Sequence, residues 1–260
     1  MLIHSLPVTD STPAPDPSAI DPEQADLTQH SQPNSPNNNS PPTMPPNVQT
    51  SPGSNPHIAA IYAARTPAEL QSLYNVWASQ YNADLSAQDY QAPTHVAQAV
   101  LKHCPNATSA FDAGCGTGLS GIALKAALPG LEVLDGVDLS EGMLGEARGA
   151  GVYGSLTTAD LTKPLSSIKD GAYDVVICVG TLTHGHVGPV PALGEFVRIV
   201  KGGKGVVAAT VLDDIWESEG FRGEVERLEG EGVVEVLGRE SLPYRKAAGV
   251  DAKVLVLKKR

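Results

Sequence analysis

Short apolar runs alternate with helical patterns along the middle of the chain, and this alternation constrains the fold more than any other feature. The predicted strands are 109–113, 131–138, 153–159, 173–180 and 204–211. Segments near 119–129, 140–149 and 190–201 instead space their apolar residues like helices. Strands that are apolar almost throughout and are joined by helices belong to a parallel sheet covered on both faces. The sequence therefore predicts an α/β fold with a Rossmann-like sheet.

The segments on either side of this alternation differ from it. Thr66-Pro67-Ala68-Glu69 forms a capping box with proline at the first helical position, and apolar residues follow with helical spacing as far as Tyr81. A second helix is predicted over 92–104. After a helix near 216–229, apolar runs at 232–238 and 250–258 have no long helix between them. We therefore expect a closing antiparallel hairpin at the sheet edge.

Residues 1–56 differ from the rest in composition. They hold 13 of the 21 prolines and five acidic residues, but no lysine or arginine, and their few apolar residues follow no strand or helix period. Such a segment cannot bury enough apolar surface to offset the entropy lost on ordering. We predict a disordered tail over 1–56 and one domain over 57–260.

Charge and cysteine content narrow the function. The 260-residue chain has a net charge of −11, and residues 57–260 carry 18 basic and 24 acidic side chains, which argues against nucleic acid or an anionic membrane as a partner. No apolar stretch is long enough to cross a bilayer, and the first residues do not resemble a secretory signal. Three widely spaced cysteines predict no zinc site and favour a reducing, cytoplasmic location.

A glycine-rich loop follows the first predicted strand. Gly114, Gly116 and Gly118 permit a tight turn that lets a ligand approach the backbone, and free N–H groups at the next helix start suit an anion. Asp138 ends the second predicted strand, where a carboxylate can accept hydrogen bonds from both ribose hydroxyls. The loop and the acid together predict an adenosine-bearing ligand.

Two ligands are compatible with that loop. Gly116-x-Gly118-x-x-Gly121 matches the dinucleotide fingerprint, so an NAD-dependent oxidoreductase remains an alternative. However, Asp112 precedes the loop, Asp160 ends the third strand, and the chain has no room for a separate substrate domain. An ammonium for Asp112 and an adenine amino group for Asp160 match S-adenosylmethionine (SAM) better than NAD.

Several segments carry a resemblance to a known family. DAGCGTG at 112–118, GVDLSEGML at 136–144, ADL at 159–161 and YDVVICVG at 173–180 are similar to motifs of the class I SAM-dependent methyltransferases. LYNVWASQYNADL at 73–85 and GTLTHGHV at 180–187 further resemble the methyltransferase-like group that includes the Williams–Beuren-region methyltransferase. The resemblance implies a seven-stranded, mostly parallel sheet with a reversed last strand.

The resemblance also implies a set of SAM-binding residues. By position, the methionine end would be held by Asp112, Gly114, Gly116 and Gly118. Asp138 would bind the ribose, with Leu139 beside it, while Asp160 and Leu161 would bind the adenine. The resemblance does not define the methyl acceptor, because the group has no shared substrate.

Two histidines and two tyrosines are further candidates. His184 and His186 follow the fourth strand, where an imidazole could take a proton from the methyl acceptor, although histidines in such turns also serve purely structural roles. Tyr81 and Tyr90 could contact the cofactor as part of a lid, or pack a helix on the sheet. We rank His186 ahead of His184 and count Tyr81 among the cofactor-binding residues.

The combined expectation is a cytoplasmic SAM-dependent methyltransferase that N- or O-methylates a small molecule, with secondary metabolism as its setting. A peptide or protein amine is the alternative acceptor, and a non-catalytic cofactor-binding module is a further alternative. Neither a metal ion nor nucleic acid nor a membrane is expected to take part, and the oligomeric state is left open.

Overall fold

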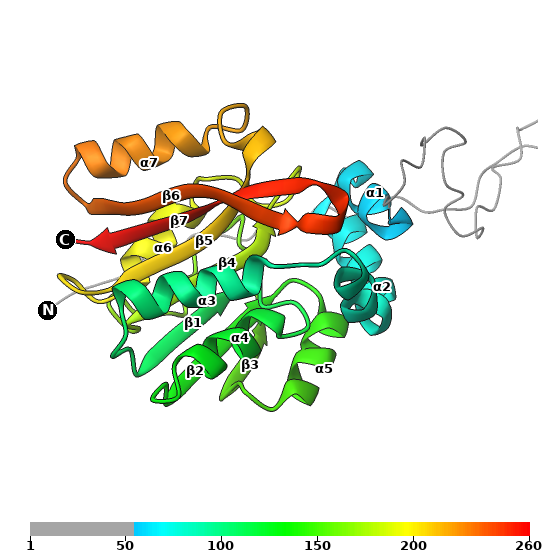
Figure 1. Cartoon of the computed structure of the whole chain (residues 1–260), viewed down its shortest axis with the longest axis horizontal. Helices are drawn as coiled ribbons and strands as arrows, with labels where there is room; N and C mark the ends of the chain where they lie inside the picture. The colour runs from blue at the N-terminus through cyan, green and yellow to red at the C-terminus, as the bar shows by residue number, and fades with distance from the viewer. Residues whose placement is uncertain (1–54) are drawn as a thin grey trace, which may run out of the picture. The chain divides into compact units, whose positions relative to one another are not determined.

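The computed structural model describes residues 55–260, which form a seven-stranded sheet flanked by helices (Figure 1). The last two residues of the predicted tail lie at the start of the first helix. Pro56 is its first residue, and the side chain of Asn55 caps it by accepting a hydrogen bond from the His57 N–H at 2.8 Å. The rest of the predicted tail lies outside the described residues.

The sheet has the strand order β3-β2-β1-β4-β5-β7-β6. Its strands are β1 (Ser109–Ala113), β2 (Val133–Asp138), β3 (Ser155–Thr158), β4 (Val175–Leu182), β5 (Val206–Leu212), β6 (Val234–Arg245) and β7 (Val250–Lys259). Strands β1 to β5 pair in parallel, whereas β7 is antiparallel to both of its neighbours, β5 and β6. The predicted Rossmann-like sheet with a reversed last strand is confirmed.

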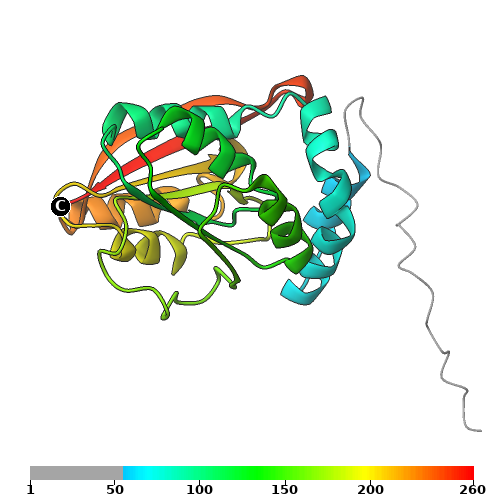
Figure 2. The ribbon, with the colours of Figure 1, turned by 90° about the horizontal axis from the view of Figure 1, so that it is seen from below.

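Helices cover both faces of the sheet, as predicted. They are α1 (Pro56–Ala63), α2 (Pro67–Ala87), α3 (Ala92–His103), α4 (Leu119–Ala127), α5 (Glu141–Ala150), α6 (Ala192–Ile199) and α7 (Phe221–Gly230). Helices α3 and α4 contact each other on one face, and α6 and α7 contact each other on the other (Figure 2). In residues 55–260, no helix is both long and apolar enough to span a bilayer.

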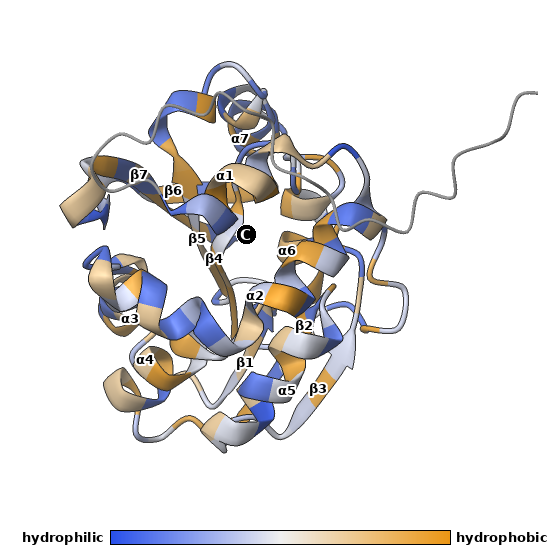
Figure 3. Ribbon diagram, turned by 90° about the vertical axis from the view of Figure 1, so that its right-hand side faces the viewer, coloured by the Kyte–Doolittle hydropathy of each residue, from blue (hydrophilic) through white to orange (hydrophobic). Residues whose placement is uncertain are grey.

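The core follows from the apolar strands. All seven residues of β5 are buried, and so are the first five of β4, because helices cover these central strands on both sides. Figure 3 shows the hydrophobic strands between the surrounding helices. This packing fixes the carboxyl ends of β1, β2 and β4 relative to one another, which is where the functional site forms.

The N-terminal helices lie at that carboxyl end (Figures 1 and 2). Helix α2 begins with the predicted capping box: the Thr66 side chain accepts a hydrogen bond from the Glu69 N–H at 3.2 Å. Helix α2 continues six residues beyond Tyr81, to Ala87, and α1 was not predicted. Asn75 anchors α2 to the start of α5 by accepting hydrogen bonds from the Ser140 hydroxyl at 2.6 Å and the Gly142 N–H at 2.9 Å.

The C-terminal elements differ in length from those predicted. Helix α7 begins at Phe221 rather than near 216, because a short 3₁₀ helix occupies Asp213–Ile215 first. Strand β6 runs on past 238 to Arg245, with irregular pairing near Gly238 and near its end. The extra length of β6 brings Arg245 beside Tyr90, which follows α2.

Candidate active site

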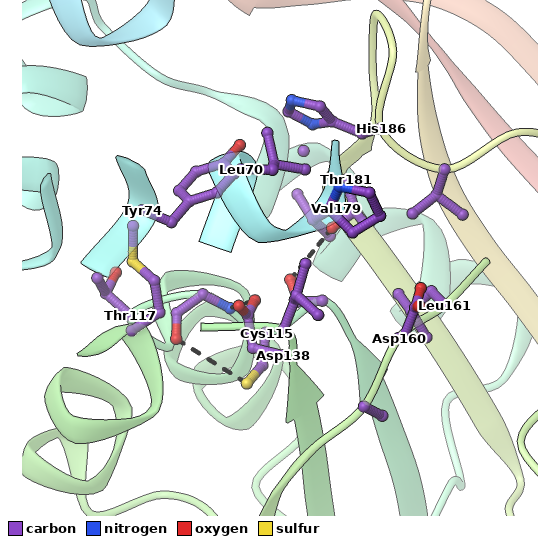
Figure 4. Close-up of a pocket in the computed structure, with 18 of the residues that line it drawn as sticks. Leu70, Tyr74, Cys115, Thr117, Asp138, Asp160, Leu161, Val179, Thr181 and His186 are labelled. Carbon is purple, nitrogen blue, oxygen red and sulfur yellow. Dashed lines mark hydrogen bonds between the residues drawn. The ribbon is translucent and has the colours of Figure 1, made fainter. Parts of the chain in front are cut away.

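A cavity opens at the carboxyl ends of β1, β2 and β4, beneath α2 (Figure 4). It contains about 1060 Å³ of space unoccupied by protein atoms, the open mouth included. Its walls come from the glycine loop, the ends of β2 and β4, the segment after β3, and the connection between α1 and α2. Ligands of open parallel sheets bind at this edge, so the cavity is the candidate site.

The glycine loop forms the floor of the cavity. Gly114, Gly116 and Gly118 have φ angles of +78°, +54° and +94°, which residues other than glycine rarely adopt. A Cβ at Gly114 would also overlap the Thr181 side chain, so only glycine fits there. Gly114 and Gly116 line the cavity, whereas Gly118 lies outside its wall, as the residue before α4.

Asp138 lies at the tip of β2 and faces the cavity. One carboxylate oxygen accepts a hydrogen bond from the Gly116 N–H at 2.9 Å and the other from the Ser140 N–H at 2.9 Å. Burial raises the pKa of Asp138, and these backbone hydrogen bonds oppose the rise. The neighbouring Leu139 also lines the cavity, and its carbonyl accepts a hydrogen bond from the Gln71 side chain at 2.7 Å.

Asp160 and Leu161 line the cavity from the segment after β3 (Figure 4). Asp160 accepts hydrogen bonds from the Thr162 N–H and hydroxyl and pairs with Lys163 at 2.9 Å. Burial alone would raise the pKa of Asp160, but these contacts together lower it, so the side chain carries a charge at neutral pH. The buried Leu161 beside it offers an apolar surface for a planar base.

Asp112 does not lie where we expected it. Its side chain is fully buried beneath the glycine loop and is not part of the cavity wall. One of its oxygens accepts hydrogen bonds from the Ser120 hydroxyl at 2.6 Å and the Tyr153 hydroxyl at 2.7 Å, while the other has no partner among residues 55–260. Asp112 therefore holds the loop through these hydrogen bonds, and its role as the ligand of the cofactor's ammonium group stays a prediction.

The residues that remain in the cavity fit SAM. The backbone at Gly114, where there is no space for a Cβ, matches the amino-acid end of SAM. The Asp138 carboxylate matches the ribose. Asp160 and Leu161 match the adenine, because they offer a hydrogen-bond acceptor beside an apolar wall. When bound, SAM supplies an electrophilic methyl group on a positively charged sulfur.

The two histidines after β4 have different surroundings. His186 lines the cavity; its Nδ1 lies 2.7 Å from the Thr183 hydroxyl, and its Nε2 is buried without a hydrogen-bond partner in the described part of the chain. Burial lowers the pKa of His186 to about 4, so its ring is neutral at physiological pH. His184 is not part of the cavity wall, and its Nε2 lies 2.8 Å from an Asp214 oxygen.

Aromatic side chains complete the wall. Tyr81 and Tyr90 line the cavity, as does Tyr74, whose ring centre lies 5.8 Å from that of His186. Sequence reasoning missed Thr181 and the α1–α2 connection around Arg65. A signal for the connection existed, because the capping box at Thr66 already placed a chain turn directly before α2.

Within residues 55–260, no three His, Cys, Asp or Glu side chains are grouped so that they could hold a metal ion.

The fold and the cavity together are those of the class I methyltransferases, in which a glycine loop after β1 and an acid at the end of β2 meet at one sheet edge.

Comparison with known proteins agrees with this class. Residues 110–203 match the family model described as a methyltransferase domain. The human methyltransferase-like protein 27 is 34% identical over 187 residues, which is 69% of this chain and 74% of that protein. The chain therefore belongs to the SAM-dependent methyltransferases, which confirms the predicted class and cofactor and sets the NAD-dependent alternative aside.

Solved structures share the fold at low identity. The [4+2]-cyclase SpnF has a TM-score of 0.56 at 16% identity, over 75% of this chain and 97% of that one. A TehB-like SAM-dependent methyltransferase from Corynebacterium glutamicum has a TM-score of 0.54 at 20% identity, over 72% of this chain and 98% of that one. These likenesses bear on the fold alone.

Proposed function

We propose that this methyltransferase transfers a methyl group to a nitrogen or oxygen of a small molecule, in the cytoplasm and within secondary metabolism. SAM would occupy the side of the cavity near β1, β2 and β3, which we call the cofactor half. The proposal therefore depends on the side near β4, which we call the acceptor half. The acceptor half is the part lined by Tyr74, Tyr90 and His186, while Tyr81, which also lines the cavity, stays among the predicted cofactor-binding residues.

The observation that carries the proposal is the enclosed Nε2 of His186, which has no hydrogen-bond partner within residues 55–260. The atom is buried, and the rings of Tyr62 and Tyr74 approach the imidazole edge-on with centre separations of 6.2 and 5.8 Å. A group that can contact this atom must fit among aromatic side chains under α1 and α2. That requirement favours a compact acceptor over a folded protein.

The acceptor half can carry out a simple displacement. Asp138, Asp160 and Leu161 would hold SAM, which would supply an electrophilic methyl group and leave as a neutral thioether. The acceptor half would hold the lone pair of the acceptor nitrogen or oxygen in line with that methyl group. The proton lost by the acceptor can pass to the neutral His186 ring and from there to solvent. Alignment of the two reactants and exclusion of water supply the rest of the acceleration.

Charge and thiol chemistry support the remaining parts of the proposal. Residues 57–260 carry a net charge of −6, which disfavours RNA as the acceptor. All three cysteines are free thiols, with Cys115 and Cys178 buried, as suits a reducing compartment.

Transfer of a labelled methyl group tests the proposal. The full chain would be incubated with ¹³C-methyl SAM and a cell extract separated into low-molecular-weight, protein and RNA fractions. We expect label in the low-molecular-weight fraction, with the methyl carbon chemical shift of an N- or O-methyl group. Asp138→Ala, which removes the ribose acceptor, should reduce the signal and serves as the control. Label confined to protein would instead support the peptide or protein amine alternative, and label in no fraction would contradict the proposal.

A further inference from the structure

A buried arginine that forms no ion pair with any of the described residues lies next to the acceptor half. Arg245, the last residue of β6, is only 9% exposed. Its Nη1 donates to the Gln88 side-chain oxygen at 3.2 Å, and its Nη2 reaches the Tyr62 hydroxyl only at 3.5 Å. Its Nε is buried with no hydrogen-bond acceptor within the part of the chain that the structure describes.

This environment is unfavourable for a guanidinium group. Arginine stays protonated in proteins and has five N–H donors to satisfy. The two acceptors near Arg245 are neutral, and none of the ion pairs within residues 55–260 includes it. A buried charge is tolerated when an opposite charge and hydrogen bonds compensate for lost hydration, so this position is suited to an anion from outside.

Arg245 lines a second, smaller cavity. This cavity is narrow: its enclosed space is sufficient for a group of the size of a carboxylate, but not for an aromatic ring. Its walls come from α1, α2 and the ends of β4 and β6, and they are mainly aromatic and aliphatic. Tyr74, Tyr81 and Gly180 line both cavities, so the second one adjoins the acceptor half.

The geometry of the guanidinium selects the kind of anion. Nε and Nη2 lie along one edge of the planar group, and among residues 55–260 the one hydrogen-bond contact of this edge is the long one to Tyr62. Two parallel N–H groups match the two oxygens of a carboxylate. The Tyr62 hydroxyl beside them can donate a further hydrogen bond.

We propose that Arg245 binds a carboxylate on the methyl acceptor within the second cavity, and that the acceptor's apolar or aromatic body lies in the acceptor half against Tyr74, which lines both cavities. The inference rests on the proposed small-molecule function and narrows its substrate class to small organic acids. The carboxylate at Arg245 then directs the opposite end of the acceptor past Gly180 towards His186.

Acid and amide pairs of simple compounds test the anion site. The full chain, saturated with S-adenosylhomocysteine, would be titrated by calorimetry and ligand-observed NMR with benzoate, phenylacetate and 3-phenylpropanoate and with their neutral amides. For the native protein we expect at least one acid to bind about tenfold more tightly than its amide. Arg245→Met should remove that preference, and Arg245→Lys should keep part of it.

Matched controls separate binding from folding. Arg239→Met removes an exposed cation from the same strand and should leave the acid preference unchanged. S-adenosylhomocysteine should bind all three variants as it binds the native protein. If Arg245→Met fails to fold, the native protein and Arg245→Lys decide the question.

The outcomes also separate this inference from the proposed function. Equal binding of every acid and its amide by the native protein, or an acid preference that survives Arg245→Met, would overturn the inference. In that case Arg245 only ties β6 to α1 and α2. Methyl transfer to neutral small molecules would likewise overturn it but leave the proposed function intact. Methyl transfer to protein alone, with acid binding retained, would overturn the proposed function while leaving an anion site at Arg245.

Discussion

In the cofactor half of the cavity, the walls are backbone turns and acids that directly follow β1, β2 and β3, whereas in the acceptor half they are side chains from distant segments. Apart from Tyr81, the cofactor half lies within residues 114–162, in the turns after β1, β2 and β3 and in the first turns of α4 and α5. The acceptor half and its adjoining cavity combine residues from α1, α2, β4 and β6. One ligand shared by a large family can be held by local motifs, but a specific acceptor requires long-range packing.

The largest expected effect is on turnover in the acceptor half. His186→Ala should lower the rate of methyl transfer to the low-molecular-weight fraction about 100-fold, because a positioned proton acceptor typically contributes at least that much. Since burial lowers the pKa of His186 to about 4, its ring is neutral throughout pH 6–8, and the native rate should show no histidine inflection there. Initial rates at saturating SAM measure both effects.

His184 provides the matched control for that experiment. It lies two residues away and contacts Asp214 rather than the cavity, so His184→Ala should change the rate less than about twofold. Both variants should bind S-adenosylhomocysteine like the native protein. A rate unaffected by His186→Ala would show that His186 is structural and that the acceptor loses its proton directly to water.

A smaller effect is expected on affinity in the cofactor half. Asp138→Ala removes a carboxylate at the ribose position and the acceptor for the Gly116 N–H. We expect binding of S-adenosylhomocysteine to weaken by about 2 kcal/mol, or roughly 30-fold in Kd, measured by calorimetry. Glu141→Ala, which removes an exposed carboxylate three residues away, is the control and should leave Kd unchanged. An unaltered Kd for Asp138→Ala would remove the ribose assignment.

The difference between the two halves also explains what the sequence alone could predict. The succession of strands and helices along the chain follows from apolar runs and helix spacing, which are local signals, and all seven predicted strands are found. Helix α1 was missed because its eight residues follow a proline-rich segment and its one buried residue, Ile61, gives no periodic pattern. The full length of β6 was missed because exposed polar residues in its middle interrupt the apolar pattern.

Single side chains in the site were harder to predict for the same physical reason. Asp138 ends β2 and Asp160 lies two residues after the end of β3, so their position in the sequence fixes their position at the sheet edge. The direction of Asp112 depends on Tyr153, 41 residues away, and Arg245 acquires its role only through contacts with Gln88 and Tyr62. The spacing of apolar residues along the sequence does not predict such long-range side-chain contacts.

The smallest expected effect is on the pH dependence of stability. It tests Asp112, which lies under the glycine loop and outside the cavity wall. Burial raises the pKa of Asp112 to about 6, although hydrogen bonds from Ser120 and Tyr153 oppose the rise. Because the ordinary value is 3.8, the folded state binds this proton more readily than the unfolded state does. Asp112 therefore adds stability at low pH that is lost as the pH rises through 6, and lowering the pH from 8 to 5 should restore about 1 kcal/mol through this group.

Asp112→Asn should abolish that contribution, because an amide has no proton to gain over this range. Urea unfolding of the ligand-free full chain at pH 5 and pH 8 measures it, and the variant should lose about 1 kcal/mol more than the native protein when the pH is lowered. His186 acts in the opposite direction, since its lowered pKa costs stability as the pH falls below 6.5, but it is present in both proteins and cancels in the comparison.

The variant Asp251→Asn, which changes an exposed carboxylate, is the control and should behave like the native protein. Parallel pH profiles for Asp112→Asn and the native protein would mean that Asp112 stays ionised in the folded state. The carboxylate would then be available to the positive end of the cofactor after all.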